Sequence, residues 1–257
     1  MVRACWVSLV VIAGCEFNPA APITIDGTTE VVVDADPGGF SDAAGLQLPS
    51  FAAAAVISRK KAANVTLPLT IPSGSERFLI VSVQLGTNCF SSAPNVVSVR
   101  YNGVALAQLA TISGTPCGLG GTRSDQWQLV DPATGTHDVV VTLSNEADTV
   151  HCGALAFTGV NQTTPVRATA KASGAGDSSS VTVASAVDDL VVNTVGQGNS
   201  IEAPGVGQTE RFLHNVNSFN TLNNSAASTA PGASMVTMTW TFGMDDEFQT
   251  ISSSLRP

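Results

Sequence analysis

The feature that most constrains the fold is a series of short β-prone segments separated by turn residues. The clearest pair is residues 96–101 and 104–112, which Asn102-Gly103 joins. Asn-Gly accepts the positive φ angles of a two-residue type I′ turn, so we expect a β-hairpin here. Residues 77–85 form a nearly continuous apolar run, which is typical of a strand buried on both faces. These segments predict an all-β protein.

Further segments of the same kind follow one another along the chain. The Gly-, Ser- and Asn-rich residues 196–233 predict surface loops with one short strand at 210–213. This many strands spaced by turns predicts a two-sheet antiparallel β-sandwich, jelly-roll-like, over residues 51–257. The other expected strands are a first one ending near Ile71 and those at residues 123–130, 137–143, 150–160, 180–186, 189–195, 234–242 and 248–255.

The chain begins with Met1-Val2-Arg3, which supplies one positive charge. A short apolar run at residues 4–12 follows and leads into Ile12-Ala13-Gly14-Cys15. As a helix this run spans about 14 Å, which is too short for a hydrocarbon core of about 30 Å. The segment resembles a bacterial lipoprotein signal peptide with its lipobox. The resemblance implies removal of residues 1–14 and lipidation of Cys15. By the same resemblance, Glu16 favours the outer membrane. The alternative is an ordinary secretory signal in which Cys15 is incidental.

Residues 15–50 predict a tether between the lipidated cysteine and the folded domain. Residues 16–50 contain six acidic side chains and no Lys or Arg, and they are rich in Pro, Gly and Ala. Such a composition cannot bury enough apolar surface to fold alone. Asp34-Ala35-Asp36 lacks the remaining ligands of an EF-hand loop, because Gly38 stands at the third ligand position.

The charge balance excludes a nucleic-acid-binding role. The chain has 20 acidic and 11 basic residues, a net charge of −9, and no basic stripe that would neutralise phosphates. Arg59-Lys60-Lys61 is its one basic cluster. We expect these residues on a solvated strand edge, where lysines prevent pairing with other chains.

Several segments together resemble a repeat-like β-sandwich domain of bacterial secreted and cell-surface proteins. The similarity covers about 180 residues, from Ser75 to Pro257, in one copy. It implies a location at the cell surface and an adhesive or structural role. The segments that carry it are RFLIVSVQL, VVSVRYNGVALAQLA, SDQWQLVDPATGTHDVVVTL, ALAFTGVNQTTPV, DDLVVNTV and MVTMTWTF with FQTISSSLRP.

Three cysteines remain once Cys5 is removed and Cys15 is lipidated. The alternating strand directions bring Cys89, Cys117 and Cys152 toward one end of the sandwich. An exported protein can form disulfides, and we favour Cys89–Cys117, with Cys117–Cys152 as the next choice. The third thiol is then expected to be buried and unreactive. A zinc site that includes His151 fits no known ligand spacing.

No motif for a known chemistry stands out. The three histidines form no zinc-protease pair, and the chain has no nucleophile elbow, Walker A or dinucleotide fingerprint. Gly176-Asp177-Ser178 and Asp148 to His151 resemble the blocks of Gly-Asp-Ser esterases. Their order is reversed and their context is β, so we attribute the resemblance to chance. Asp245, Asp246 and Glu247 are a candidate calcium site, and a polar turn is the alternative.

Sugar binding usually needs exposed aromatic platforms. Trp127 and Trp240 lie inside predicted strands, so we expect them in the core, whereas Tyr101 beside the Asn-Gly turn is expected to be exposed. The sequence therefore predicts a non-enzymatic, lipid-anchored cell-surface protein that works in envelope structure or in adhesion to a glycan or an envelope protein. We expect the protein to need no cofactor. If it binds one, calcium is the candidate. The alternatives are a carbohydrate- or calcium-binding module and an unrecognised glycosidase or lyase.

Overall fold

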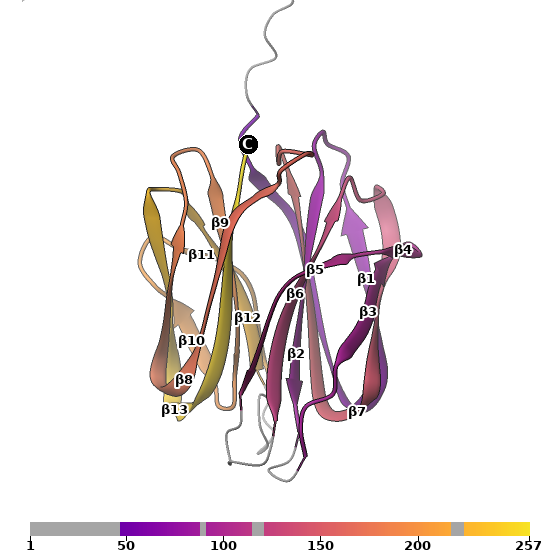
Figure 1. Ribbon diagram of the computed structural model, residues 1–257, viewed down its shortest axis with the longest axis vertical. Coiled ribbons are helices and arrows are strands. Elements are labelled where there is room, and N and C mark those ends of the chain that lie inside the picture. The colour runs from indigo at the N-terminus through magenta and orange to yellow at the C-terminus, as the bar shows by residue number, and fades with distance from the viewer. Residues whose placement is uncertain (1–46, 88–90, 115–120, 217–223) are drawn as a thin grey trace, which may run out of the picture. The chain divides into compact units, whose positions relative to one another are not determined.

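The computed structural model describes residues 47–87, 91–114, 121–216 and 224–257. These residues form strands and no helix, and the fold is a sandwich of two antiparallel sheets, as predicted (Figure 1). The first sheet consists of β1 (Ser50–Ile71), β2 (Phe78–Gly86), β3 (Val96–Tyr101), β4 (Val104–Ala105), β5 (Ala107–Gly114), β6 (Thr122–Val130) and β7 (Gly135–Thr158). The second consists of β8 (Val166–Ala184), β9 (Leu190–Gln197), β10 (Ile201–Pro204), β11 (Thr209–Asn215), β12 (Asn224–Pro231) and β13 (Met235–Leu255).

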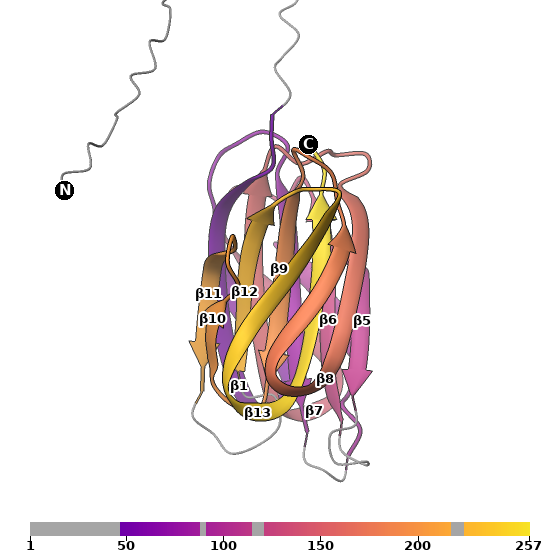
Figure 2. The same cartoon turned by 90° about the vertical axis from the view of Figure 1, so that its left-hand side faces the viewer.

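Each sheet is folded over on itself by a pair of long strands that bend together. In the first sheet, β1 pairs with β7 along its whole length, and in the second β8 pairs with β13 in the same way. The order β4-β3-β7-β2-β6-β5 joins β3 to the first part of β7 and β2 to its second part. The bends of these long strands lie at the lower edge of Figure 1 and are seen from another side in Figure 2.

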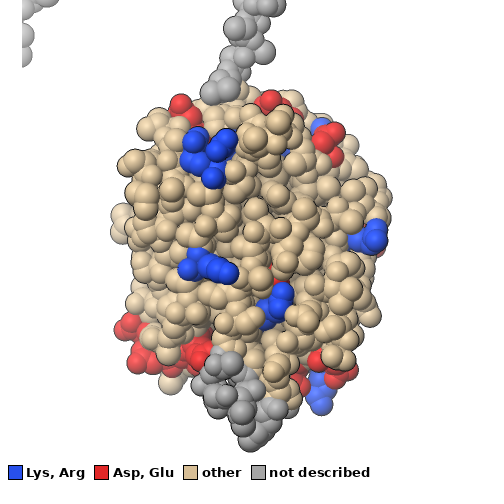
Figure 3. Space-filling view, viewed as in Figure 1, with Lys and Arg blue, Asp and Glu red and all other residues tan. Residues whose placement is uncertain are grey.

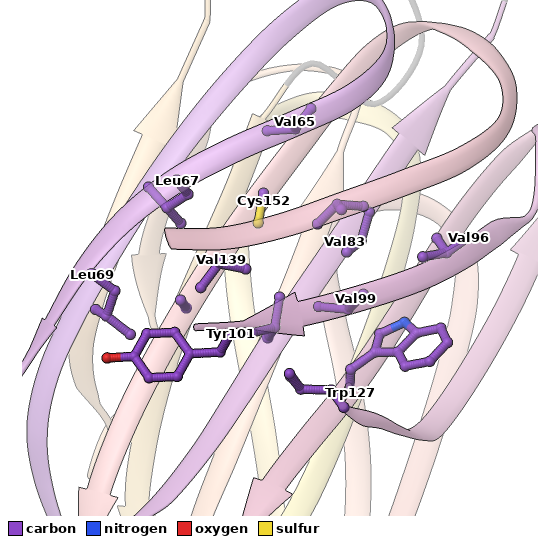
Figure 4. Close-up of a cluster of buried hydrophobic side chains, with 14 of the residues drawn as sticks. Val65, Leu67, Leu69, Val83, Val96, Val99, Tyr101, Trp127, Val139 and Cys152 are labelled. Carbon is purple, nitrogen blue, oxygen red and sulfur yellow. The ribbon is translucent and has the colours of Figure 1, made fainter. Parts of the chain in front are cut away.

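The two layers of the folded first sheet enclose an apolar core (Figure 4). Strand β2 lies between this core and the second sheet, which explains its continuous apolar sequence. Leu79, Val81 and Val83 point into the core, whereas Phe78 and Ile80 belong to the cluster shared with the second sheet. All nine residues of β2 are buried.

The sheets pack against each other through a face that is apolar in one part and polar in the other. The apolar part is formed by Phe78, Ile80, Leu155, Phe157, Val160, Val192, Phe212, Ala227 and Leu255. In the polar part, the Gln126 side-chain amide donates to Thr194 Oγ1 at 2.9 Å and to the Ile251 carbonyl at 3.1 Å. Gln249 Nε2 donates to Thr122 Oγ1 at 2.7 Å. These hydrogen bonds offset part of the cost of burying the two amides.

The predicted hairpin forms only at its tip. Asn102 and Gly103 have φ angles of 48° and 77°, as a type I′ turn requires. Strand β3 pairs with β4 over two residues, and the chain then leaves this layer so that β5 pairs with β6. Strand β5, which follows the turn, thus pairs with β6 in the layer that faces the second sheet.

The prediction of loops over residues 196–233 is wrong in part, because β10 and β12 lie there in addition to β11. Seven of the eight residues of β12, Asn224–Ala230, are buried although most are Ser, Ala or Thr. Their small side chains fit between two closely packed layers, which an apolar periodicity does not reveal. Strand β8 likewise begins earlier than expected, at Val166.

Candidate functional site

Two of the cysteine predictions lie outside the described residues, namely lipidated Cys15 and the disulfide between Cys89 and Cys117. Cys152 is described, on β7, and its thiol is free and fully buried in the core of the first sheet. Burial raises the pKa of this thiol to about 12. The expectation that this cysteine is buried is confirmed. A raised pKa makes the thiolate scarce at neutral pH, so low reactivity stays a prediction.

The acidic residues Asp245, Asp246 and Glu247 lie at the bend of β13. Asp246 Oδ2 accepts a hydrogen bond from Asn199 Nδ2 at 2.9 Å, and its Oδ1 accepts one from the Glu247 amide at 2.7 Å. Burial, and then the charge of Asp246, raises the pKa of Glu247. Asp245 is exposed. Nowhere in the described ranges do three His, Cys, Asp or Glu residues form a group that could hold a metal ion.

Acidic and basic side chains both lie at this end of the sandwich. Figure 3 shows its larger acidic groups near the lower edge of the molecule. The bend of β1 carries Arg59, Lys60 and Lys61, all exposed, and its Lys61 has a φ angle of 47°. In the described sheet β1 pairs only with β7, so these residues lie on an edge strand, as predicted.

The two blocks that resemble an esterase lie on different sheets. Ser178 is exposed at the bend of β8, and its hydroxyl donates to the neighbouring Asp177 at 3.2 Å. His151 lies on β7 in the face between the sheets, where its ring packs edge-on against that of His214 with centroids 5.9 Å apart. The described geometry does not join this serine and this histidine into a catalytic pair.

The expectation that Tyr101 is exposed is wrong. Its side chain is fully buried, and its hydroxyl donates to the carbonyls of Ala133 at 3.1 Å and Gly135 at 3.3 Å. Burial raises the pKa of this hydroxyl. The hydrogen bonds hold the turn that precedes β7 and explain why the ring points inward. Trp127 and Trp240 are buried as predicted, so no Trp or Tyr of the described residues offers an exposed platform for a sugar.

A cavity of about 380 Å³ opens beside the Asn-Gly turn, and the sequence did not reveal it. Its lining combines an amide, a carboxylate, a hydroxyl and an imidazole around one aliphatic side chain. His137 Nε2 lies 3.0 Å from the Thr134 carbonyl, and the ring packs edge-on against Tyr101. These contacts hold the ring of His137 in place. The lining residues are Asn102, Gly103, Thr136, His137, Asp138 and Val140.

A second cavity, of about 290 Å³, lies near the bend of β7. Its lining is rich in oxygen atoms and includes the carboxylates of Glu146 and Asp148 together with Thr87 and Asn145. Neither cavity could be found from the sequence, because each joins segments that are about 35 to 60 residues apart.

Across the described strands and loops, the chain forms no helix with the length and apolar character needed to cross a membrane. No protein-family model, no curated protein and no solved structure matches this chain.

Proposed function

We propose that this chain is an exported, lipid-anchored protein of the bacterial cell surface with a non-enzymatic structural or adhesive role. The observation that carries the proposal is Ile12-Ala13-Gly14-Cys15 directly behind a charged start and a short apolar run. Acylation of the thiol and of the new amino end would provide the two chains that stable anchoring needs.

The arrangement of the described domain supports a tethered role. The described chain begins at the same end of the sandwich as the C-terminus, whereas the bends of the long strands lie at the opposite end (Figure 1). A tether from Cys15 would therefore join the domain at the membrane-proximal end. Fully extended, the residues between Cys15 and Gln47 would reach about 100 Å. The charged bends would then face away from the membrane and toward partners.

Incorporation of fatty acid tests the anchor. Cells that express the full chain are grown with radiolabelled palmitate, and the protein is isolated from the membrane fraction. We expect label in the native chain and none in Cys15→Ser. Cys5→Ser is the matched control, because Cys5 belongs to the segment that is removed, and it should remain labelled. Equal labelling of the Cys15→Ser variant would refute the proposal.

A second candidate, a glycan-binding module, is favoured by the cavity at the Asn-Gly turn. Side chains that both donate and accept hydrogen bonds, such as Asn102 and Thr136, suit the hydroxyl groups of a neutral sugar, and the Asp138 carboxylate accepts from them. Its size is within the range of small-ligand sites.

Glycan-array binding of the full chain tests this candidate. Asp138→Ala should reduce binding at least tenfold, whereas Asp177→Ala, an exposed acid on the other sheet, should leave it unchanged. A blank array, or binding that survives Asp138→Ala, would eliminate the glycan site and leave the anchored structural role as it stands.

A further inference from the structure

The two sheets repeat one scheme of strand pairing. Five pairs of the first sheet have a counterpart in the second when the strands are taken in chain order. The correspondences are β1·β7 with β8·β13, β2·β7 with β9·β13, β2·β6 with β9·β12, β5·β6 with β11·β12, and β3·β7 with β10·β13. The small strand β4 has no counterpart among the described strands.

A bulge in the edge pair recurs at the same place. In β5 the register shifts between Gln108 and Ala110, which face the successive residues Trp127 and Gln126 of β6. In β11 the register shifts between Glu210 and Phe212, which face the successive residues Ser228 and Ala227 of β12. Bulges are specific features that related structures retain.

A second bulge and the bend of the long strands recur as well. Val96 and Ser98 of β3 face Leu143 and Thr142, just as Ile201 and Ala203 of β10 face Phe242 and Thr241. At the bend, the β1 pairing passes from Ala62↔Ala147 to Asn64↔Thr142, and the β8 pairing passes from Gly176↔Asp246 to Ser178↔Thr241. In both cases, a step of two residues along the first strand corresponds to a step of five residues along its partner.

The face between the sheets has the pattern of a two-fold symmetric dimer. Strand β5 contacts β8, and its counterpart β11 contacts β1, which is the counterpart of β8. Likewise β6 contacts β13, and β12 contacts β7. Exchanging the two sheets thus maps these four contacts onto one another, as in an isologous interface, whereas the contact between β5 and β13 has no counterpart of similar extent between β11 and β7.

Named contacts follow this symmetry. Lys171 Nζ on β8 donates to the Thr111 carbonyl of β5 at 2.7 Å, and His214 Nε2 on β11 lies 3.1 Å from Ser58 Oγ on β1. The apolar side chains that line this face also correspond. Phe78 pairs with Phe157 within the first sheet, and Leu190 pairs with Leu255 at the corresponding place in the second.

We infer that residues 50–158 and 166–255 are two copies of one module, and that the buried face between them is a self-complementary surface whose partner is a second module of the same fold. The sequence hides the duplication. Between residues 78–86 and 190–198, only Val83 and Gly86 have the same residue type as their counterparts, Val195 and Gly198. The inference is independent of the lipid anchor.

Cleavage of the folded chain between the modules tests this inference. A recognition site for a sequence-specific protease is inserted between Thr163 and Thr164, both exposed in the connection from β7 to β8. The full chain is purified, cut under native conditions, and passed through size-exclusion chromatography with light scattering. We expect both fragments to elute together at the mass of the uncut protein, with an unchanged β-sheet circular dichroism spectrum.

Two variants and a mixing experiment make the test specific. In the cut chain, Leu155→Glu, which places a charge in the buried face, should separate the fragments, whereas Thr66→Glu on the exposed face of β1 should not. Mixing cut samples with and without ¹⁵N label should give hybrid pairs in native mass spectrometry. Fragments that unfold or aggregate after the cut, or fragments that never associate, would overturn the inference.

Discussion

At the scale of single residues, the face between the two sheets leaves no room at Gly153. A Cβ atom at this position would lie 2.4 Å from Phe212 Cζ, far inside van der Waals contact. We therefore expect Gly153→Ala to lower the free energy of unfolding by about 1 to 3 kcal/mol, the range for overpacking. Urea denaturation followed by circular dichroism measures it.

Gly176→Ala provides the matched control for this prediction. A Cβ at Gly176 would meet nothing closer than 3.7 Å, so the same change there should be neutral or slightly stabilising. Equal stability of the two variants would show that the sheets are not packed as closely as described.

A buried polar network lies in the core of the second sheet, around Asn193. Its Oδ1 accepts from Trp240 Nε1 at 2.8 Å, and its Nδ2 donates to Thr250 Oγ1 at 2.7 Å and Ser252 Oγ at 2.9 Å. Asn193→Leu would leave the indole donor unpaired, so we expect a loss of about 1 to 3 kcal/mol in unfolding free energy.

A double-mutant cycle identifies the cause of that loss. Trp240→Phe removes the donor itself, so Asn193→Leu should destabilise the Trp240→Phe protein by clearly less than the native one. Strictly additive losses would mean that the hydrogen bond to Trp240 does not contribute.

Asp189 accepts hydrogen bonds that stabilise the turn between β8 and β9. Arg167 Nε lies 2.5 Å from its Oδ2, Ser254 Oγ donates to the same oxygen at 2.7 Å, and the Ala186 amide donates at 3.1 Å. Burial alone would raise the pKa of Asp189, but the hydrogen bonds from Arg167 and Ser254, the charge of Arg167 and the amide outweigh it. The pKa is therefore held below its ordinary value.

This depressed pKa gives stability a defined pH dependence. The ionised carboxylate stabilises the fold fully above the unfolded pKa of about 3.9, and the contribution is lost as the pH falls through the lower folded value. Asp189→Asn should lower the unfolding free energy by about 1 to 3 kcal/mol at pH 7 and by progressively less below pH ~4. A difference that stays constant between pH 7 and pH 3 would contradict this assignment.

At the scale of secondary-structure elements, β1 is an edge strand protected by charge. Exposed Lys60 lies at its bend, where an uncharged side chain would offer a template for pairing with another chain. We expect Lys60→Val to increase aggregation at 37 °C, measured by light scattering. Arg100→Val removes the same charge from β3, where Arg100 is paired on both sides, and should not aggregate. Equal aggregation of both variants would indicate a general charge effect.

Elements with strong local signals could be predicted from the sequence, and elements defined by packing could not. The apolar run of β2 and the Asn-Gly turn predict their own conformation, because burial on both faces and positive φ angles restrict the residue types. In contrast, β5 pairs with β6 in the layer that faces the second sheet, and this pairing depends on tertiary packing. The small residues of β12 carry no periodicity, and Tyr101 points inward because carbonyls distant in sequence accept its hydroxyl.

At the scale of the whole molecule, the all-β class followed from the number of strands, whereas the repetition within the fold did not. Equivalent positions share burial and register rather than residue type, as Leu79 and Val191 illustrate. Candidate sites divide in the same way. The acidic triplet was visible as a run, but the cavity beside Gly103 joins a turn to the start of β7, which only the tertiary structure brings together.

In the proposed function, Cys15 anchors this two-sheet domain to a membrane. The most direct measurement is mass spectrometry of the N-terminal peptide from the chain extracted from membranes. We expect a peptide that begins at Cys15 and carries the mass of a diacylglyceryl group on its thiol. A mature chain that begins at another residue, with Cys15 absent or unmodified, would contradict it.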